Sequence, residues 1–166
     1  VVSNLSLQTI NDVPGTLIQL QRCLKPDGLF LASLFGDETL HELRISLMEA
    51  ELERRGGISP RTAPQTTVQD VGMLLQRAGF ALPVVDSQRL TATYPDIWKL
   101  MQDLRGMGET NVVKARPKGL TTPGLFQDAE ALYRKRFSNP DGTLNATFDV
   151  LTISAWAPAD SQLKAL

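Results

Sequence analysis

The nine residues DLRGMGETN, from Asp103 to Asn111, hold the densest group of side chains that could take part in chemistry. Two carboxylates, a guanidinium and an amide stand within them, on Asp103, Arg105, Glu109 and Asn111. Such groups bind and orient a polar substrate through charge-assisted hydrogen bonds. The same pattern also fits a helix end followed by a solvated loop. The residues by themselves favour neither interpretation.

A second polar group surrounds His41, the single histidine of the chain, which lies among Asp37, Glu38 and Glu42. An imidazole beside carboxylates can act as a general base or as a metal ligand. Acidic side chains are, however, also favoured at helix N-termini by the helix dipole. We therefore expect an exposed helical histidine without a partner, and we assign no metal site.

Composition limits the possible functions. The 166 residues are 42% hydrophobic and 21% charged, which suits a globular domain with one core. Seventeen basic and 18 acidic side chains give a net charge of −1, so we expect no nucleic-acid partner. No apolar run approaches the roughly 20 residues of a membrane span. Cys23, the single cysteine, excludes an internal disulfide and is expected to be a small buried apolar side chain.

Alternating apolar runs and helix signals predict an α/β fold. Residues 1–158 are expected to form one domain, followed by a flexible tail over 159–166. The turn KPDG separates the first helix from the second strand. The last two strands are expected to pair antiparallel at one edge of the sheet. Strands are predicted at 1–7, 29–34, 82–93 and 146–157, and helices at 11–24, 38–55, 67–78, 95–104 and 122–137.

The segments VVSNLSLQTIND and RCLKPDGLFLASLFG resemble strands four and five of class I S-adenosylmethionine-dependent methyltransferases. The resemblance implies the C-terminal part of a doubly wound Rossmann-like sheet, in which parallel strands end in an antiparallel pair and helices form a lid. On this map strands one to three are absent, and Val1 is expected to be a cut through the cofactor site rather than a natural beginning.

A narrower resemblance covers most of the chain and involves a group with two branches. One branch holds malonyl-acyl-carrier O-methyltransferases of biotin synthesis, and the other holds complex I assembly factors described as arginine hydroxylases. The segments GGISP and DLRGMGETN favour the second branch. The main functional expectation is an S-adenosylmethionine-dependent methyltransferase, of which this chain is an inactive C-terminal portion. The alternatives are a hydroxylase or assembly role on the same fold, and a non-enzymatic partner-binding fragment.

The resemblance implies that the end of the first strand lines the methionine part of S-adenosylmethionine, with Asn4 offering its carbonyl oxygen to the amino group. The alternative is that Asn4 only caps a strand end. The glycine-rich loop and the ribose-binding acid of the family are missing, so the chain alone is expected to bind the cofactor weakly or not at all. Gly106-Met107-Gly108 follows a helix and is therefore no dinucleotide fingerprint. The implied cofactor residues are Ser3, Asn4, Leu5, Ser6 and Gln8.

On the substrate side, the resemblance places DLRGMGETN in a lid over the acceptor, which would be a protein or an acyl carrier. The catalytic residues stay unknown. Aromatic side chains near this lid are more often part of a core. The implied substrate-side residues are Tyr94, Asp103, Arg105, Glu109 and Asn111.

Two surface features predict partners. Lys114, Arg116 and Lys118 form a small basic cluster that is more typical of a solvated loop than of a docking site. The apolar strand 1–7 would be an uncovered sheet edge, so we expect self-association through it. The expected compartment is the bacterial cytoplasm, with the mitochondrial matrix as the alternative.

Overall fold

The computed structural model describes residues 1–62, 65–111, 113–117, 119 and 121–162. The chain divides into two compact units, each with its own hydrophobic core. The first unit comprises Val1–Asp37, Gln65–Arg89 and Asp149–Leu166, and the second comprises Glu38–Pro64 and Leu90–Phe148. The expectation of one domain over residues 1–158 stays a prediction.

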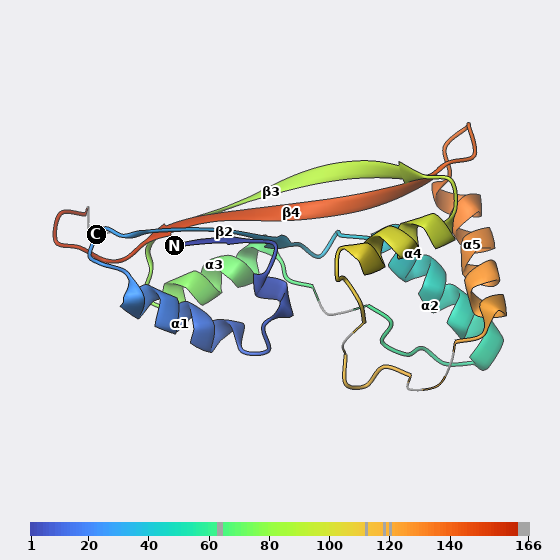
Figure 1. Cartoon of the computed structure of the whole chain (residues 1–166), viewed down its shortest axis with the longest axis horizontal. Coiled ribbons are helices and arrows are strands. Elements are labelled where there is room, and N and C mark those ends of the chain that lie inside the picture. Colours follow the sequence, from blue (N-terminus) through green and yellow to red (C-terminus); the bar gives the residue numbers. More distant parts are fainter. Residues whose placement is uncertain (63–64, 112, 118, 120, 163–166) are drawn as a thin grey trace. The chain divides into compact units, whose positions relative to one another are not determined.

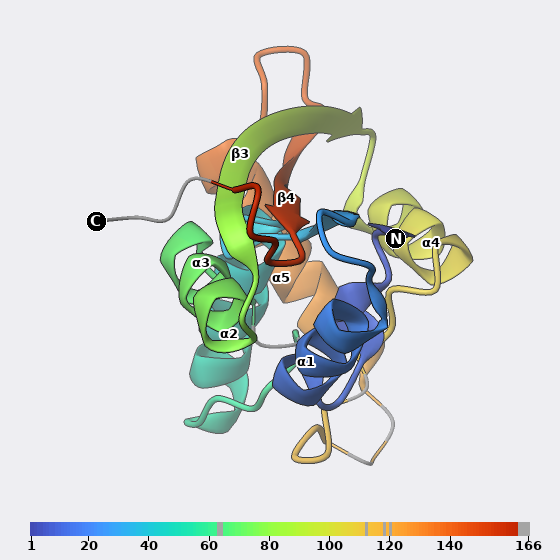
Figure 2. The ribbon, with the colours of Figure 1, turned by 90° about the vertical axis from the view of Figure 1, so that its left-hand side faces the viewer.

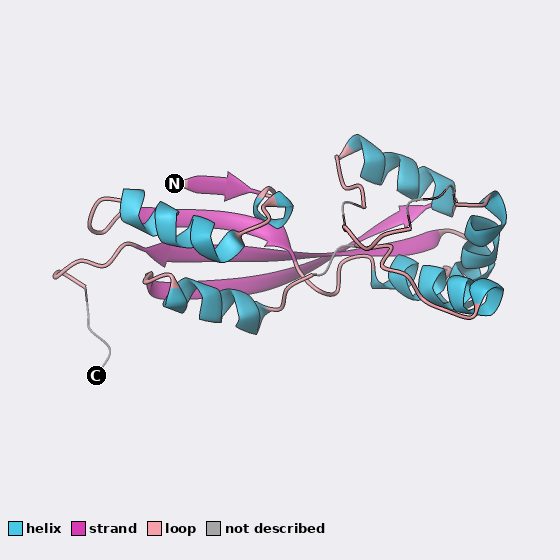
Figure 3. Cartoon of the chain, turned by 90° about the horizontal axis from the view of Figure 1, so that it is seen from below, coloured by secondary structure: helices cyan, strands magenta, loops and turns pink. Residues whose placement is uncertain are grey.

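The sheet has four strands in the order β1-β2-β4-β3 and is mixed rather than purely parallel. Strand β1 runs parallel to β2, and β4 runs antiparallel to β2, as the arrowheads in Figure 3 show. The α/β prediction is therefore confirmed. The strands are β1 (Val2–Asn4), β2 (Leu29–Phe35), β3 (Ala81–Tyr94) and β4 (Leu144–Trp156).

The strand-helix-strand unit at the start of the chain has clear local causes. Helix α1 (Val13–Cys23) begins at Asp12, whose carboxylate accepts a hydrogen bond from the Gly15 amide at 2.9 Å. At its other end Asp27 adopts a positive φ, and the Gly28 amide donates to the Lys25 carbonyl at 2.8 Å. A Cβ on Gly28 would lie 2.7 Å from that carbonyl oxygen, so the turn requires glycine here.

The core of the first unit lies on one face of its sheet. Along β2, Phe30, Ala32 and Leu34 are buried while Leu29 and Leu31 are exposed, which is the alternation of a strand covered on one side. Helices α1 and α3 (Val68–Arg77) lie together on the covered side (Figures 1 and 2). Helix α3 begins with a capping box between Thr67 and Asp70, as predicted.

The first strand is shorter than predicted. Instead of a strand over 1–7, β1 ends at Asn4, Leu5 adopts a left-handed φ of 45°, and Leu7–Thr9 forms the 3-10 helix η1. The turn brings Leu7 into the core, where it is 3% exposed. Burial of this one leucine therefore outweighs continuation of the strand.

The second unit holds three helices among its described residues, namely α2 (His41–Arg55), α4 (Ile97–Gly106) and α5 (Pro123–Phe137). Helix α2 packs on α5, and their leucines share a core with Ile97 and Leu100 of α4. The predicted start of α2 at residue 38 is wrong by three residues. Leu40 has a φ of 52°, a left-handed conformation that a right-handed helix cannot include.

The two long strands contribute residues to both units. They are neighbours in the sheet, β3 is an edge strand, and their arrowheads point in opposite directions in Figure 3. The prediction of a terminal antiparallel pair is thus confirmed. The prediction for Cys23 is wrong, because this last residue of α1 is exposed.

Candidate functional site

Polar side chains gather where β1 and β2 end in the first unit. Asn4 pairs in register with Ser33, so the carboxyl ends of these parallel strands meet at one edge. The Ser33 hydroxyl donates to the Asn4 side-chain oxygen at 2.6 Å and accepts from the Leu5 amide at 3.1 Å. Ser33 thereby fixes the Asn4 side chain and the turn that follows β1.

The other residues implied for the cofactor join the same group. The hydroxyls of Ser3 and Ser6 are 2.9 Å apart, and the Gln8 side-chain amide donates to the Leu5 carbonyl at 2.9 Å. We name Ser3, Asn4, Ser6, Gln8 and Ser33 the strand-end cluster. Four of its five members were predicted. Ser33 was missed, although a serine near the end of the apolar run LFLASLF was a visible signal.

The strand-end cluster supplies neutral hydroxyls and amides. The Asn4 carbonyl oxygen already accepts from Ser33, so it has one lone pair left for a further donor, and the exposed amide nitrogen stays available. These groups fit the amino and carboxylate ends of the methionine part of S-adenosylmethionine. The cluster contains no carboxylate for the ribose hydroxyls, so it fits only that part of the cofactor.

The segment DLRGMGETN lies in the second unit, where its residues have separate partners. Lys99 donates to Asp103 at 2.6 Å, one helical turn apart on α4, while Arg105 is exposed. The helix ends in a turn, in which the Glu109 amide donates to the Leu104 carbonyl at 2.9 Å. Its first half is therefore a helix C-terminus, in line with the second interpretation of the sequence pattern.

Tyr94, the last residue of β3, lies near this helix and packs against the core of the second unit. Burial raises the pKa of its phenol, and the neighbouring Asp103 carboxylate raises it further. The phenol is therefore a neutral hydrogen-bonding group at physiological pH. Trp98 is half exposed and meets the Phe126 ring edge-on, with the centroids 5.4 Å apart.

Asn111 connects this segment to a distant loop. Its side-chain nitrogen donates to the Pro60 carbonyl at 2.9 Å, and its side-chain oxygen accepts from the Val113 amide at 3.1 Å. Pro60 belongs to the GGISP segment. The two segments that favour the arginine-hydroxylase branch are thus in direct contact.

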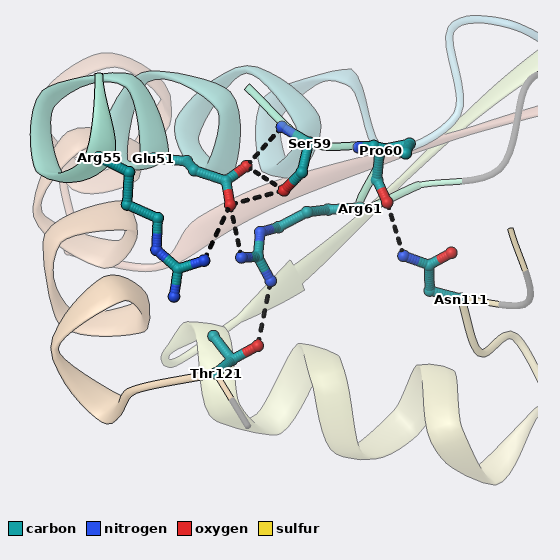
Figure 4. A network of polar contacts seen from close by, with 7 residues as sticks. All are labelled: Glu51, Arg55, Ser59, Pro60, Arg61, Asn111 and Thr121. Atoms are coloured by element: carbon teal, nitrogen blue, oxygen red, sulfur yellow. Dashed lines mark hydrogen bonds and ion pairs between the residues drawn. The ribbon is translucent and has the colours of Figure 1, made fainter. Parts of the chain in front are cut away.

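Beside this contact, a buried carboxylate organises the loop, as Figure 4 shows. Glu51 of α2 is 2% exposed and accepts from the Ser59 amide at 2.8 Å, from the Ser59 hydroxyl at 2.6 Å and from Arg61 at 2.6 Å. Burial by itself would raise the pKa of this carboxyl. The hydrogen bonds from Arg61 and Ser59 outweigh burial and lower the pKa to about 2.

Arg61 extends the network to the start of α5. Its second terminal nitrogen donates to the Thr121 hydroxyl at 3.1 Å, and Arg55 adds a longer ion pair to Glu51 at 3.7 Å. We name Glu51, Ser59, Arg61, Asn111 and Thr121 the loop network. A cavity of about 280 Å³ adjoins it, lined by Arg44, Leu47, Met48, Ile58, Ser59, Pro60, Arg61 and Thr62.

Sequence reasoning missed most of the loop network, because Glu51 stands in the charged run ELERR, which is typical of an exposed helix face. The one available signal was the GGISPR loop, whose serine and arginine follow Glu51 by eight and ten residues.

The group around His41 has a structural role. His41 is half-buried rather than exposed, and its Nδ1 lies 3.1 Å from the Glu38 carbonyl and 3.6 Å from the Glu42 carboxylate. The expectation of an exposed histidine without a partner is therefore wrong. Glu42 is buried and accepts from the amide and hydroxyl of Thr147 on β4. Among the described residues, no group of three or more His, Cys, Asp or Glu could hold a metal ion.

In the basic cluster, Arg116 donates to the Val113 carbonyl at 3.1 Å, and Lys118 lies outside the described residues.

Within the part of the chain that the structure describes, each helix is too short or too polar to cross a bilayer.

Comparison with known proteins places these features in a family. Over 164 residues, 99% of its length, the chain is 46% identical to the mitochondrial arginine-hydroxylase NDUFAF5 of Danio rerio. Over the full length of the chain, it is 44% identical to the Dictyostelium discoideum protein of the same name. It is also 38% identical, over 94% of its length, to the malonyl-[acyl-carrier protein] O-methyltransferase of Halorhodospira halophila. The chain belongs to the class I methyltransferase-like family. No family model matches it.

This methyltransferase-like chain spans about half the length of the curated relatives it matches: 51%, 38% and 51% of these three. Solved structures agree on the fold. The YcgJ protein of Bacillus subtilis matches 95% of the chain with a TM-score of 0.54 at 11% identity, and the match covers 63% of that protein. A Bacillus halodurans protein described as a methyltransferase matches the same share with a TM-score of 0.53 at 13% identity, and the match covers 68% of it.

Proposed function

We propose that this chain provides the substrate-side part of an arginine-hydroxylating protein on a methyltransferase fold. The observation that carries the proposal is the contact between Asn111 and Pro60, which joins the two segments typical of that branch. The identities support it, since the hydroxylases match at 44–46% and the methyltransferases at 36–38%.

Hydroxylation replaces a C–H bond of the substrate arginine by C–OH. With dioxygen as the oxidant, one oxygen atom enters the substrate and the other leaves as water, so a two-electron reductant is also consumed. The contribution of this chain would be to bind and orient the guanidinium. Glu109 carries a carboxylate suited to it, because a carboxylate accepts two parallel hydrogen bonds from a guanidinium. Tyr94 adds a neutral phenol beside Asp103.

Methyl transfer is the second candidate, and the strand-end cluster favours it. Asn4 and Ser6 would bind the amino and carboxylate groups of S-adenosylmethionine, which supplies an electrophilic methyl group when bound. The relatives named as methyltransferases support this candidate at lower identity. In both candidates the methyltransferase-like chain works as part of a longer protein.

The test is a hybrid protein in which this chain replaces the matching 164-residue segment of the Danio rerio relative. The hybrid is incubated with a mitochondrial extract, and mass spectrometry then searches arginine side chains for the added mass of one oxygen atom. The intact Danio rerio protein is the positive control, and a hybrid with Glu109→Gln is the negative control.

Oxygen addition that depends on Glu109 would support arginine hydroxylation. Transfer of a labelled methyl group from S-adenosylmethionine without oxygen addition would support the second candidate instead. If neither product forms while the intact relative is active, both candidates fail.

A further inference from the structure

The Glu51 carboxylate is 2% exposed, although it lies in the last two turns of α2 within a charged run. A buried charge is costly unless hydrogen bonds satisfy it. Here one loop provides nearly all of them, because Ser59 contributes its amide and hydroxyl, and Arg61 contributes its guanidinium. The neighbouring acid on the same helix, Glu53, is exposed instead. The charge of Glu51 therefore acts on the loop rather than on the helix surface.

The contacts to Ser59 and Arg61 fix the residue between them. Pro60 has a restricted φ, and both of its neighbours are tied to the same carboxylate. Its carbonyl oxygen consequently has a defined direction, and this oxygen is the acceptor for the Asn111 side chain. Glu51 and Asn111 thus act on opposite sides of one short loop.

Asn111 passes this constraint on to the chain that follows it. Its side-chain nitrogen is held by Pro60, and its side-chain oxygen accepts from the Val113 amide. An amide bonded at both ends has one orientation, so the oxygen that accepts from the Val113 amide is placed by the position of the Pro60 carbonyl. Two sets of hydrogen bonds, joined by the backbone of Ser59, Pro60 and Arg61, thus lead from Glu51 to Val113.

We propose that Glu51 is a positioning residue, which sets the conformation of the segment around Asn111 through the loop of Ser59, Pro60 and Arg61. This segment is substrate-side only if the proposed function holds, whereas the link to Glu51 stands on contacts within the second unit.

Amide hydrogen exchange on the chain as it exists tests the link. The Ser59 amide donates to Glu51, and the Val113 amide donates to Asn111. Glu51→Gln is expected to lower the protection of both amides by roughly fivefold, which corresponds to a net hydrogen bond of about 1 kcal/mol. The amide of Met107, which donates to Asp103 within α4, should keep its protection. Glu53→Gln is the matched control and should change none of the three.

Asn111→Ala separates the two sets of hydrogen bonds. It should remove the protection of Val113 and leave that of Ser59, and adding Glu51→Gln should then change Val113 no further. Such non-additivity is the signature of residues that act through one another. Should Glu51→Gln fail to fold, Ser59→Ala replaces it, because it removes one of the bonds to Glu51 and keeps the Arg61 pair.

Activity of the hybrid protein provides the second readout. If the segment binds substrate, Glu51→Gln raises KM roughly tenfold while kcat changes less, because the reacting groups are untouched. Equal loss of protection at Ser59, Val113 and Met107 would mean that Glu51 only stabilises the unit, and would overturn the proposal. An inactive hybrid would instead count against the proposed function, and the exchange data would still decide the role of Glu51.

Discussion

The side-chain amide of Asn111 donates to the main-chain carbonyl of Pro60 at 2.9 Å, across 51 residues of sequence. Pro60 is also held from its other side, because its two neighbours bind the buried Glu51 carboxylate. This contact joins the loop after α2 to the segment after α4 within the second unit. Four predictions test this contact and the other features of the two units.

Asn111→Asp changes a single atom at the contact with Pro60. The variant replaces the donor nitrogen with a carboxylate oxygen, which would face the Pro60 carbonyl. We expect the free energy of unfolding to fall by about 1–2 kcal/mol, since a donor is lost and two acceptors meet. Urea titration followed by Trp98 fluorescence, in a Trp156→Phe background, reports on the second unit. Gln102→Glu, an exposed change on α4, is the control and should have no effect.

The lowered pKa of Glu51 predicts that the free energy of unfolding falls in acid. Its pKa is about 2 in the folded chain and has the ordinary glutamate value of 4.5 in the unfolded chain, so folding favours the ionised form. The stability that it contributes is therefore present above pH 4.5 and is lost as the pH falls toward 2. A shift of this size corresponds to at most roughly 3 kcal/mol.

The measurement for Glu51 is the free energy of unfolding between pH 2 and pH 6, in steps, for the native chain and for Glu51→Gln. The native chain should lose more stability than the variant on acidification. Parallel curves for the two proteins would refute the assigned role of the ionised carboxylate.

Ser33→Ala tests the strand-end cluster. The change removes the hydroxyl that donates to Asn4 and accepts from Leu5, so the Asn4 side chain loses its orientation. In the hybrid protein we expect calorimetry to detect S-adenosylmethionine binding that is weakened by roughly fivefold to tenfold. Thr152→Ala is a matched control, because Thr152 pairs with Ser33 in the sheet but is exposed on β4. Equal affinities of both variants would argue against a cofactor role for Asn4.

Strand β1 predicts self-association. It is an edge strand of the sheet, and Val2 is 77% exposed beside the exposed Leu29 and Leu31 of β2. Open edges with apolar side chains and no charge pair readily with a second chain. Light scattering at increasing concentration should reveal dimers or larger species, and Val2→Lys should shift them toward monomer. Met73→Lys, at an exposed position of α3, should leave association unchanged. A native chain that stays monomeric would disprove the prediction.

Much of the fold could be predicted because its causes are local. Asp12 and the Thr67–Asp70 pair begin helices, and the turn at Gly28 ends a crossover, through contacts within four residues. The alternation of β2 likewise shows in the sequence as an apolar run. The failures share a different cause. Leu5, Leu7 and Leu40 leave the expected conformation because distant packing or pairing partners outweigh their local propensity.

The candidate sites divide in the same way. Asn4 and Asn111 could be found in the sequence, because each stands in a polar segment beside a recognisable strand or helix. Their partners could not. Ser33 meets Asn4 only through the parallel register of β1 and β2, and Pro60 meets Asn111 only after α2 and α4 have joined the core of the second unit.

The sequence by itself determined the elements, the α/β class and the resemblance to methyltransferases, since caps, turns and apolar periodicity act over a few residues. Only the tertiary structure decided that Glu51, within a charged helical run, is a buried ion that binds Ser59 and Arg61. A carboxylate is exposed or buried according to what packs over it, and that depends on long-range contacts that no local pattern records.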